Sequence, residues 1–451
     1  MSHPQHIADG TQRSAWRTAS RPKVWALPVV VVLVVMGVLA SMYLASSIHA
    51  SDNLKSFPVA VVDQDTGTTL PDGTEQNVGE QLAHGIVTGV DDQKFDIQQL
   101  SLDEAETQMD DGDLYGAIVI PKTFSSDLQD FASSATTSDA VDTPEVTVLT
   151  NPRTGTGTTP IVTSMGTTAL TQARTTVGEQ LVDATQQALG SAGAPALSGA
   201  AHAALAQPYT IDVTAYHPLP DGTGNGLSPF YYALLIVLAG FTGSLIVNTF
   251  VDSSLGFVPS EMGPRYELGK HSGLSRFATL VLKWTIMAGV AVTVSGLYLG
   301  VSYALDMPID HPWILLGYSA AMVWAVAVVA QTISAIFGGI GMLINLFIFV
   351  IFSLPSAGGT FPPEATPGLF RWLGSFEPMH QIYLGTRSVL YLDGTWDSGL
   401  GRSLLFGAAA VVVGLVVGWL TMRHYDRQGY GRGHQLHAAG HATAPAPALE
   451  G

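Results

Sequence analysis

The sequence predicts an α-helical polytopic membrane protein with six transmembrane helices, one plus five, and an extracytoplasmic α/β domain between the first and second helices. Apolar residues make up 47% of the 451 residues and charged residues only 12%. The apolar residues gather in stretches near the roughly 20 residues with which a helix crosses a bilayer. Residues 51–229 contain no such stretch, and this segment is long enough for a domain of its own.

The first predicted span is followed, after that long segment, by five closely spaced ones. A cleaved signal peptide is the alternative for the first span. Its apolar core is longer than the usual roughly 7–15 residues, and Ile48 disrupts a small-residue cleavage site, so we interpret it as an uncleaved anchor. The fifth span is slightly short for a full crossing. In order, the spans are residues 24–45, 230–251, 277–305, 313–337, 341–357 and 404–422.

Basic residues flank the spans unevenly, and their excess marks cytoplasmic segments. This predicts the cytoplasmic membrane as the location, with an N-terminal segment (1–23) and a disordered C-terminal tail (423–451) both in the cytoplasm. Three bases in the last external segment, Arg371, Arg387 and Arg402, oppose this orientation. The supporting bases are Arg13, Arg17, Arg21 and Lys23, then Arg265, Lys270 and Arg276, then Arg423, Arg427 and Arg432.

The formal net charge of −17 is concentrated between the first two spans. Residues 51–229 hold 24 acidic residues against five basic ones, which argues against a nucleic-acid partner. The chain has no cysteine, so disulfides, thiol chemistry and cysteine metal sites are excluded.

Strand and helix signals alternate through residues 51–160, which predicts a small α/β sheet. Ser101 and Glu104 have the spacing of a capping box. Residues 132–143 resemble a Ser/Thr-rich linker, and residues 188–207 have a small, flexible composition. Strands are expected at 58–62, 94–100, 115–121, 144–152 and 209–219, and helices at 75–86, 101–109, 123–131 and 161–189.

Three stretches in this order are recognisable together: FPVAVVDQDTG (57–67), LYGAIVIPKTFSSDL (114–128) and SAGGTFPPE (356–364). They resemble the YhgE/Pip group of bacterial membrane proteins, which is related to type-2 ABC exporter permeases. The resemblance implies a five-helix permease-like membrane domain at 230–422 that packs with a second copy or a related chain around a substrate path. It does not identify the cargo.

The sequence contains no loop that would bind the phosphates of ATP. The nearest approach, GPRYELGKHSG (263–273), has Pro264 and His271 where the phosphate-binding motif needs Gly and Ser or Thr. A transporter of this kind therefore needs a separate cytoplasmic ATPase as partner. Nucleophile-elbow, zinc-protease and dinucleotide motifs are also missing, so we expect neither an enzyme nor a cofactor.

The cytoplasmic loop between the second and third spans combines charge with short helical spacing, which is typical of a docking segment. In the resembling permeases such a loop transmits ATPase motion, so Glu261, Arg265 and Glu267 are candidates for coupling. An ordinary solvated loop is an equal alternative.

Four polar residues fall within the predicted spans, where polar groups are costly and often functional: Asn248, Lys283, Gln331 and Asn345. Lys283 lies near the inner end of its span, and we expect it to extend toward the headgroups. Gln331 and Asn345 are expected to form hydrogen bonds between helices. We expect no buried Asp or Glu among them, so none of the four forms a proton relay by itself. Two Gly-x-x-x-Gly pairs, 296 with 300 and 414 with 418, are interpreted as packing contacts and not as a dimerisation motif.

Two clusters invite a metal-site interpretation. Asp63, Asp65 and Asp72 lie in DQDTGTTLPDGTE, which lacks the remaining ligands of a calcium loop, and an Asp/Gly turn is favoured. The histidines at 434, 437 and 441 occur in a tail of disordered composition. No metal is therefore predicted.

The fifth span runs into two glycines and two prolines, Gly358, Gly359, Pro362 and Pro363. We interpret them as a hinge at the outer mouth of a path, and a plain helix stop is the alternative. The aromatic, amphipathic stretch 368–394 that follows is expected in the interface or re-entering the membrane. An external loop is the alternative.

The predicted function is a membrane permease subunit that exports lipophilic or amphiphilic substrates. The alternative is a non-transporting component of a secretion apparatus, or a receptor-like surface protein. A co-transcribed ATPase gene would favour transport, and neighbouring secretion genes would favour the alternative.

Overall fold

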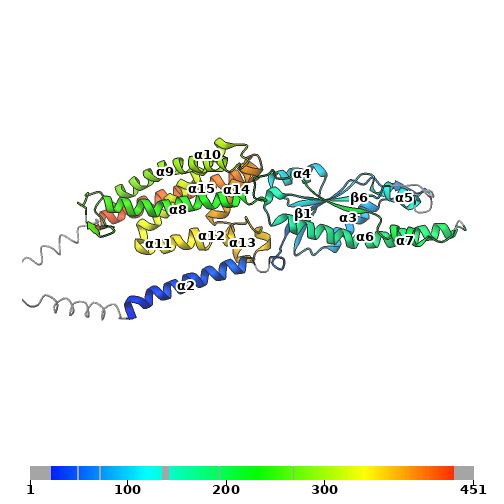
Figure 1. The fold of residues 1–451 in the computed structure, drawn as a ribbon, viewed down its shortest axis with the longest axis horizontal. Helices are drawn as coiled ribbons and strands as arrows, with labels where there is room; N and C mark the ends of the chain where they lie inside the picture. The colour runs from blue at the N-terminus through cyan, green and yellow to red at the C-terminus, as the bar shows by residue number, and fades with distance from the viewer. Residues whose placement is uncertain are drawn as a thin grey trace, which may run out of the picture.

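A computed structural model shows an elongated molecule in which an α/β domain and a helix bundle lie end to end (Figure 1). The end of the bundle away from the α/β domain is called the far end below. The structure describes residues 22–47, 50–70, 73–134, 142–191, 193, 195–267 and 269–430.

The α/β domain is built on a mixed five-stranded sheet with strand order β4-β1-β5-β6-β7. β1 pairs in parallel with β4 and β5, β6 is antiparallel to β5, and β7 is parallel to β6. A two-residue pair, β2 (Thr68–Thr69) and β3 (Glu75–Gln76), forms a separate ribbon. The sheet strands are β1 (Phe57–Asp63), β4 (Phe95–Gln99), β5 (Gly116–Ile120), β6 (Glu145–Thr150) and β7 (Thr210–Ala215).

Helices cover both faces of this sheet. Alternate residues of β1 point to opposite faces, because side chains in a strand alternate: Val59 and Val61 pack under α3, α5 and α6, whereas Ala60 and Val62 pack under α4. The domain helices are α3 (Val78–Gly89), α4 (Leu102–Asp111), α5 (Phe124–Ser134), α6 (Thr158–Ser191) and α7 (Gly199–Leu205), with one 3-10 turn, η1 (Pro152–Thr154).

The predicted strands and helices of this domain are all found, and so is the capping box at Ser101 and Glu104. The flexible stretch predicted at 188–207 is partly wrong, because α7 forms there with Ser198 as its N-cap. Most of the predicted linker 132–143 lies outside the described residues.

Among the described residues, six helical stretches are long and apolar enough to cross a membrane, which confirms the polytopic prediction. α10 is the centre of the bundle, with 56% of its most apolar window buried, whereas α2 has only 6% buried. The stretches are α2 (Pro22–Ser47), α8 (Ser228–Ser254), α9 (Arg276–Ala304), α10 (Pro312–Phe337), the stretch Gly339–Ser356, and the stretch Trp396–Arg427.

The fifth stretch is interrupted rather than continuous. It consists of α11 (Gly339–Leu346), a π-helical turn η2 (Phe347–Ile351) and α12 (Ser353–Ser356). The sixth begins with another π-helical turn, η4 (Trp396–Leu400), and continues as α15 (Gly401–Arg427). α15 therefore extends past residue 422, where the last span was predicted to end, into the predicted tail 423–451. The tail beyond Tyr430 lies outside the described residues.

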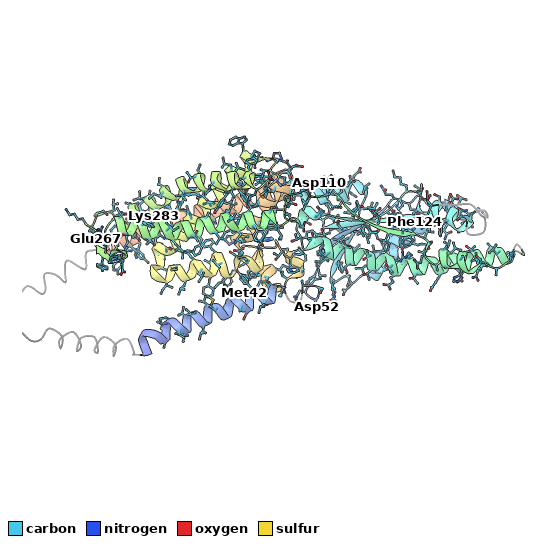
Figure 2. The ribbon with its side chains drawn as sticks, viewed as in Figure 1. Met42, Asp52, Asp110, Phe124, Glu267 and Lys283 are labelled. Carbon is cyan, nitrogen blue, oxygen red and sulfur yellow. The ribbon has the colours of Figure 1, made fainter. Side chains whose placement is uncertain are left out.

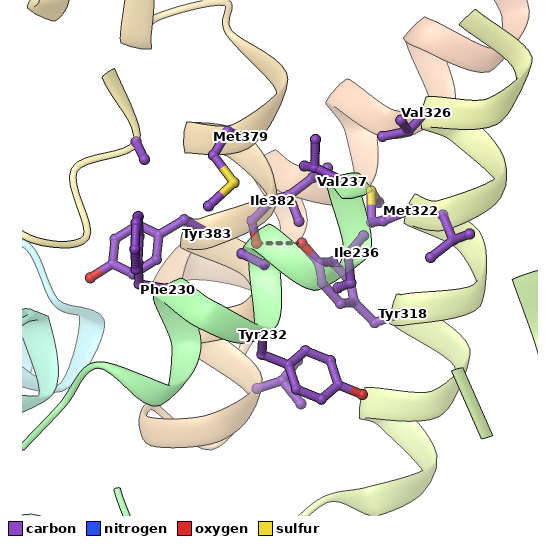
Figure 3. Close-up of a cluster of buried hydrophobic side chains, with 14 of the residues drawn as sticks. Phe230, Tyr232, Ile236, Val237, Tyr318, Met322, Val326, Met379, Ile382 and Tyr383 are labelled. Atoms are coloured by element: carbon purple, nitrogen blue, oxygen red, sulfur yellow. Dashed lines mark hydrogen bonds between the residues drawn. The ribbon is translucent and has the colours of Figure 1, made fainter. Parts of the chain in front are cut away.

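Between these two stretches the chain forms η3 (Pro363–Ala365), α13 (Gly368–Gly374) and α14 (Pro378–Tyr391). The external-loop alternative for this region is wrong, because most of α14 is buried against α8, α10 and α15. Figure 3 shows the centre of this packing, where the Tyr318 hydroxyl of α10 donates a hydrogen bond of 2.9 Å to the carbonyl oxygen of Ile382 in α14.

Candidate functional site

Three of the four predicted intramembrane polar residues line one cavity of about 500 Å³ at the far end of the bundle. Asn248 comes from α8, Lys283 from α9 and Gln331 from α10. Polar groups inside a bundle are retained where they face a cavity or one another. The three helices thus bring together residues that are far apart in the sequence.

Lys283 does not extend toward the headgroups as predicted. Its Nζ lies 2.8 Å from Oδ1 of Asp252, and the two side chains are only 6% and 18% exposed. The sequence reading missed Asp252 because the second span was predicted to end at residue 251, whereas α8 continues to Ser254. Asn248 and Asp252 are four residues apart and so share one face of α8, which is the signal that was available. Asp252, which is partly buried, is thus an acidic partner that the sequence analysis did not identify.

Gln331 and Asn345 behave differently from each other. The Asn345 amide donates hydrogen bonds of 2.9 Å to the carbonyl oxygen of Ala330 and 3.0 Å to the Ser334 hydroxyl, which joins α11 to α10 as predicted. Gln331 is 1% exposed, and neither atom of its amide has a hydrogen-bond partner among the described residues. An unsatisfied buried amide costs about 1–3 kcal/mol, so Gln331 supplies the cavity with an unused donor and acceptor.

The three coupling candidates lie on an exposed β-hairpin at the same end of the molecule. β8 (Ser260–Met262) pairs antiparallel with β9 (Arg265–Glu267), and Glu261 lies opposite Tyr266. The predicted helical spacing in this loop is therefore wrong, because Gly263 and Pro264 form a turn between two short strands. Figure 2 shows Glu267 at the far end, the end of the bundle in which Lys283 also lies.

The predicted hinge of Gly358, Gly359, Pro362 and Pro363, here called the glycine turn, lies where the bundle meets the α/β domain. Gly358 has φ +78°, a conformation that favours glycine. A Cβ on Gly359 would lie 2.3 Å from a ring carbon of Phe230 at the start of α8. A Cβ on Gly157 of the α/β domain would lie 2.5 Å from the carbonyl oxygen of Thr360. The close approach of this turn to the Phe230 side chain and to the backbone at Gly157 thus requires glycine here.

A second cavity, of about 360 Å³, lies at this junction and is here called the junction cavity. Tyr115 of the α/β domain donates a hydrogen bond of 3.0 Å to Oε2 of Glu364, and Arg387 of α14 donates one of 3.3 Å to the carbonyl oxygen of Thr154. Burial raises the pKa of the Glu364 carboxyl above its ordinary value. The lining includes Gly358, Pro362 and Pro363 of the predicted hinge with Asp111, Asp113, Glu364, Arg387 and Arg402.

Two residues that sequence reasoning missed fix the glycine turn to α14. Glu377 is 3% exposed and caps α14, since it accepts hydrogen bonds from the backbone N–H of His380 (3.0 Å) and the hydroxyl of Ser353 (2.8 Å). His380 Nδ1 lies 2.9 Å from the carbonyl oxygen of Ala357. The available signal was Glu377 followed by Pro378, because proline favours the first position of a helix.

Asp65 accepts hydrogen bonds at the starts of two helices, and Asp63 stabilises the turn that positions Asp65. The Asp65 carboxylate accepts hydrogen bonds from the backbone N–H of Gly79 and of Ser125, at the starts of α3 and α5, and Asp63 accepts one from the N–H of Asp65. No group of three or more potential metal-ligating side chains occurs among the described residues. Asp72 and the three tail histidines lie outside them.

The two Gly-x-x-x-Gly pairs differ in their surroundings. A Cβ on Gly414 or Gly418 would lie 2.8 Å from Val328 or Trp284, so this pair allows α15 to approach its neighbours closely, as predicted. A Cβ on Gly296 or Gly300 would meet nothing within 4 Å. For Gly296 and Gly300, the interpretation as packing contacts within this chain is therefore wrong.

Comparison with known proteins gives two matches. The family described as "ABC-2 family transporter protein" matches residues 24–420. The uncharacterized protein YhgE of Bacillus subtilis (strain 168) is 23% identical over 218 residues, which is 48% of this chain and 26% of that protein. The match thus spans about a quarter of the length of this relative. No solved structure matches.

Proposed function

The chain belongs to the ABC-2 transporter family, and from that premise we propose that it is a membrane permease subunit that exports lipophilic or amphiphilic substrates across the bacterial cytoplasmic membrane. The observation that carries the proposal is the family match over residues 24–420, which includes the α/β domain and five of the six candidate spans in full. A multi-pass transport component is the function of the family. The class of substrate and the direction of transport, out of the cell, go beyond the family match and are proposed.

In the proposed orientation both termini are cytoplasmic and the α/β domain is extracytoplasmic. Basic residues at the far end support it, because cytoplasmic segments carry an excess of Lys and Arg. Arg265 and Lys270 follow α8, Arg276 begins α9, and Arg423 is in the last turns of α15. The far-end cavity then opens toward the cytoplasm and the junction cavity lies at the outer surface.

We propose that a separate ATPase docks on the β8–β9 hairpin, where Glu261, Arg265 and Glu267 are its contacts. Hydrogen bonds that connect the end of this loop to the bundle support the assignment. The Asp426 carboxylate of α15 accepts hydrogen bonds from the backbone N–H of Arg276 (2.9 Å) and Phe277 (3.2 Å), and so caps α9 directly after the loop. Displacement of the loop would therefore move α9 and α15 together.

A dimer fits the exposure of the spans. The C-terminal part of α2 contacts α12 and η2, where the Tyr43 hydroxyl donates a hydrogen bond of 3.2 Å to the carbonyl oxygen of Val350, but its N-terminal part diverges from the bundle (Figure 1). Gly296 and Gly300 of α9 leave open space beside them. A second copy or a related chain can occupy these faces. Gly358, Gly359, Pro362 and Pro363 would then form a hinge at the outer mouth of the path.

Deletion of the gene, with measured accumulation and toxicity for a panel of lipophilic compounds, tests the proposal. We expect increased accumulation of at least one compound, and recovery on complementation with the wild-type gene. The protein purified alone should not hydrolyse ATP above background. Unchanged accumulation across the panel would favour the non-transporting secretion or receptor alternative, and specific ATP hydrolysis in a clean preparation would refute the need for a separate ATPase.

A further inference from the structure

The α/β domain contains a groove of about 670 Å³ between α3 and α6, here called the α3–α6 groove. This volume is within the roughly 300–1,000 Å³ of small-molecule binding sites. None of its described lining residues is charged, although 29 of the 179 residues in 51–229 are. A groove lined at random would carry about three charges among 20 residues, so the lining departs from the acidic character of the domain.

Two neighbouring rows of α6 form one wall of this groove. Residues four apart lie above one another on a helix, so each row runs along the groove. One row is apolar and the next is polar but uncharged. The apolar row is Ile161, Met165, Ala169, Ala173 and Val177, and the polar row is Ser164, Thr168, Gln172, Thr176 and Gln180.

The opposite wall is held open by glycines of α3. Gly85 and Gly89 line the groove beside Leu82 and Ile86. A Cβ added to either glycine would meet nothing within 4 Å. Larger side chains therefore fit there without a clash, and in doing so would occupy the groove.

One end of the groove begins where the chain leaves the membrane. Ser51 and Leu54 line it, and α2 ends at Ser47. The backbone N–H of Lys55 donates a hydrogen bond of 3.0 Å to the carbonyl oxygen of Glu364, which holds this end against the bundle. From Pro160 the wall runs along α6 to Gln180, about 30 Å at 1.5 Å per residue. A lipid chain spans half of a hydrocarbon core of about 30 Å, so the groove is long enough for an extended chain.

We propose that the α3–α6 groove binds an acyl chain of a lipid-like substrate that enters from the outer leaflet beside α2. The apolar row of α6 and the apolar side chains of α3, the absence of charge in the lining, and continuity with the membrane surface together favour a neutral hydrocarbon chain as the occupant, with the uncharged polar row along its edge. The inference deepens the proposed function and rests on it for the orientation of the domain. It assigns the substrate class as an acylated amphiphile.

Photolabelling of the full-length protein in nanodiscs tests the proposal. The probe is a phosphatidylcholine with a diazirine in its palmitoyl chain, and labelled peptides are mapped by mass spectrometry. We expect label within residues 78–90 and 160–180, reduced at least fivefold in Gly85→Phe and Gly89→Phe. Gly190→Phe is the matched control, because this glycine of α6 also has open space but lies outside the groove. Label in this control should be unchanged.

A second arm uses diazirine palmitic acid added from solution to nanodiscs without labelled lipid. If the groove is labelled by palmitic acid from solution but not by the phosphatidylcholine probe in the nanodisc, entry of the chain from the leaflet is refuted. Three results would overturn acyl-chain binding. They are label found only in the membrane spans, equal label in wild type and in Gly85→Phe and Gly89→Phe, or crosslinks between two protein copies at the groove. Binding needs no transport, so a labelled groove with unchanged compound accumulation in the deletion strain would refute the export function and leave the site standing.

Discussion

Removal of one partner of the Lys283–Asp252 pair should destabilise the bundle, whereas removal of both should not. At 2.8 Å the attraction between two unit charges is about 6 kcal/mol for an effective dielectric constant of about 20, and desolvation opposes much of it. A single substitution removes this counter-charge from a largely buried charged group, which costs up to about 3–5 kcal/mol. We take the lower value, because Asp252 keeps 18% of its side-chain surface exposed.

The assay is thermal unfolding of the protein in nanodiscs for Lys283→Met, Asp252→Leu and the double variant. A loss of about 3 kcal/mol corresponds to a fall in Tm of roughly 6–12 °C for a cooperative unit of about 200 residues. The double variant should unfold within about 1 kcal/mol of the wild type, because an apolar pair of similar size can replace a buried ion pair. Lys270→Met is the control, since Lys270 is exposed near the same end, and its effect should be within about 0.5 kcal/mol.

An unchanged Tm for Lys283→Met would refute this reasoning and restore the interpretation that Lys283 extends toward the headgroups. Simple addition of the two single effects in the double variant would also refute it, because a double-mutant cycle on residues in contact must show coupling.

Three further predictions concern the junction and the hairpin. Gly359→Ala should lower Tm and activity because its Cβ would clash with Phe230, whereas Gly368→Ala, with nothing within 4 Å, should be near neutral; normal activity in the first variant would reduce the turn to a helix stop. The Glu364 carboxyl has a raised pKa in the folded state, so the stability that it contributes is fully present below its unfolded pKa of about 4.3 and is lost as pH rises through the folded value. Glu364→Gln should remove this part of the dependence of Tm on pH, and an identical pH profile would contradict it. Charge reversal of the three hairpin candidates should abolish transport without affecting membrane insertion, whereas Glu145→Lys on the α/β domain should change neither; full transport in the hairpin variant would support an ordinary solvated loop.

The parts of the fold that depend on local pattern could be predicted from the sequence. The six spans follow from hydropathy alone, and the capping box at Ser101 depends on residues three apart. The partner of Lys283 could not be predicted, because it lies on another helix and past the apparent end of the span. Burial of α14 on nearly all sides was also not predictable, because its composition is amphipathic and left both an interfacial and an external position open. Arg387 and His380 are tolerated there because other segments supply partners, such as the carbonyl oxygens of Thr154 and Ala357.

α8 connects the two candidate sites physically, and this bears on how a permease of this shape can work. Its first turn holds Phe230 against Gly359 at the junction, and its last turns carry Asn248 and Asp252 into the far-end cavity. The helix has 27 residues, about 40 Å at 1.5 Å per residue, and contains no internal break between these points. A rigid helix of this length cannot shift at one end without moving at the other. If α8 shifts as a rigid body at the far-end cavity, Phe230 shifts with it, and the turn at Gly359, which packs against the Phe230 ring, is where that shift would be felt.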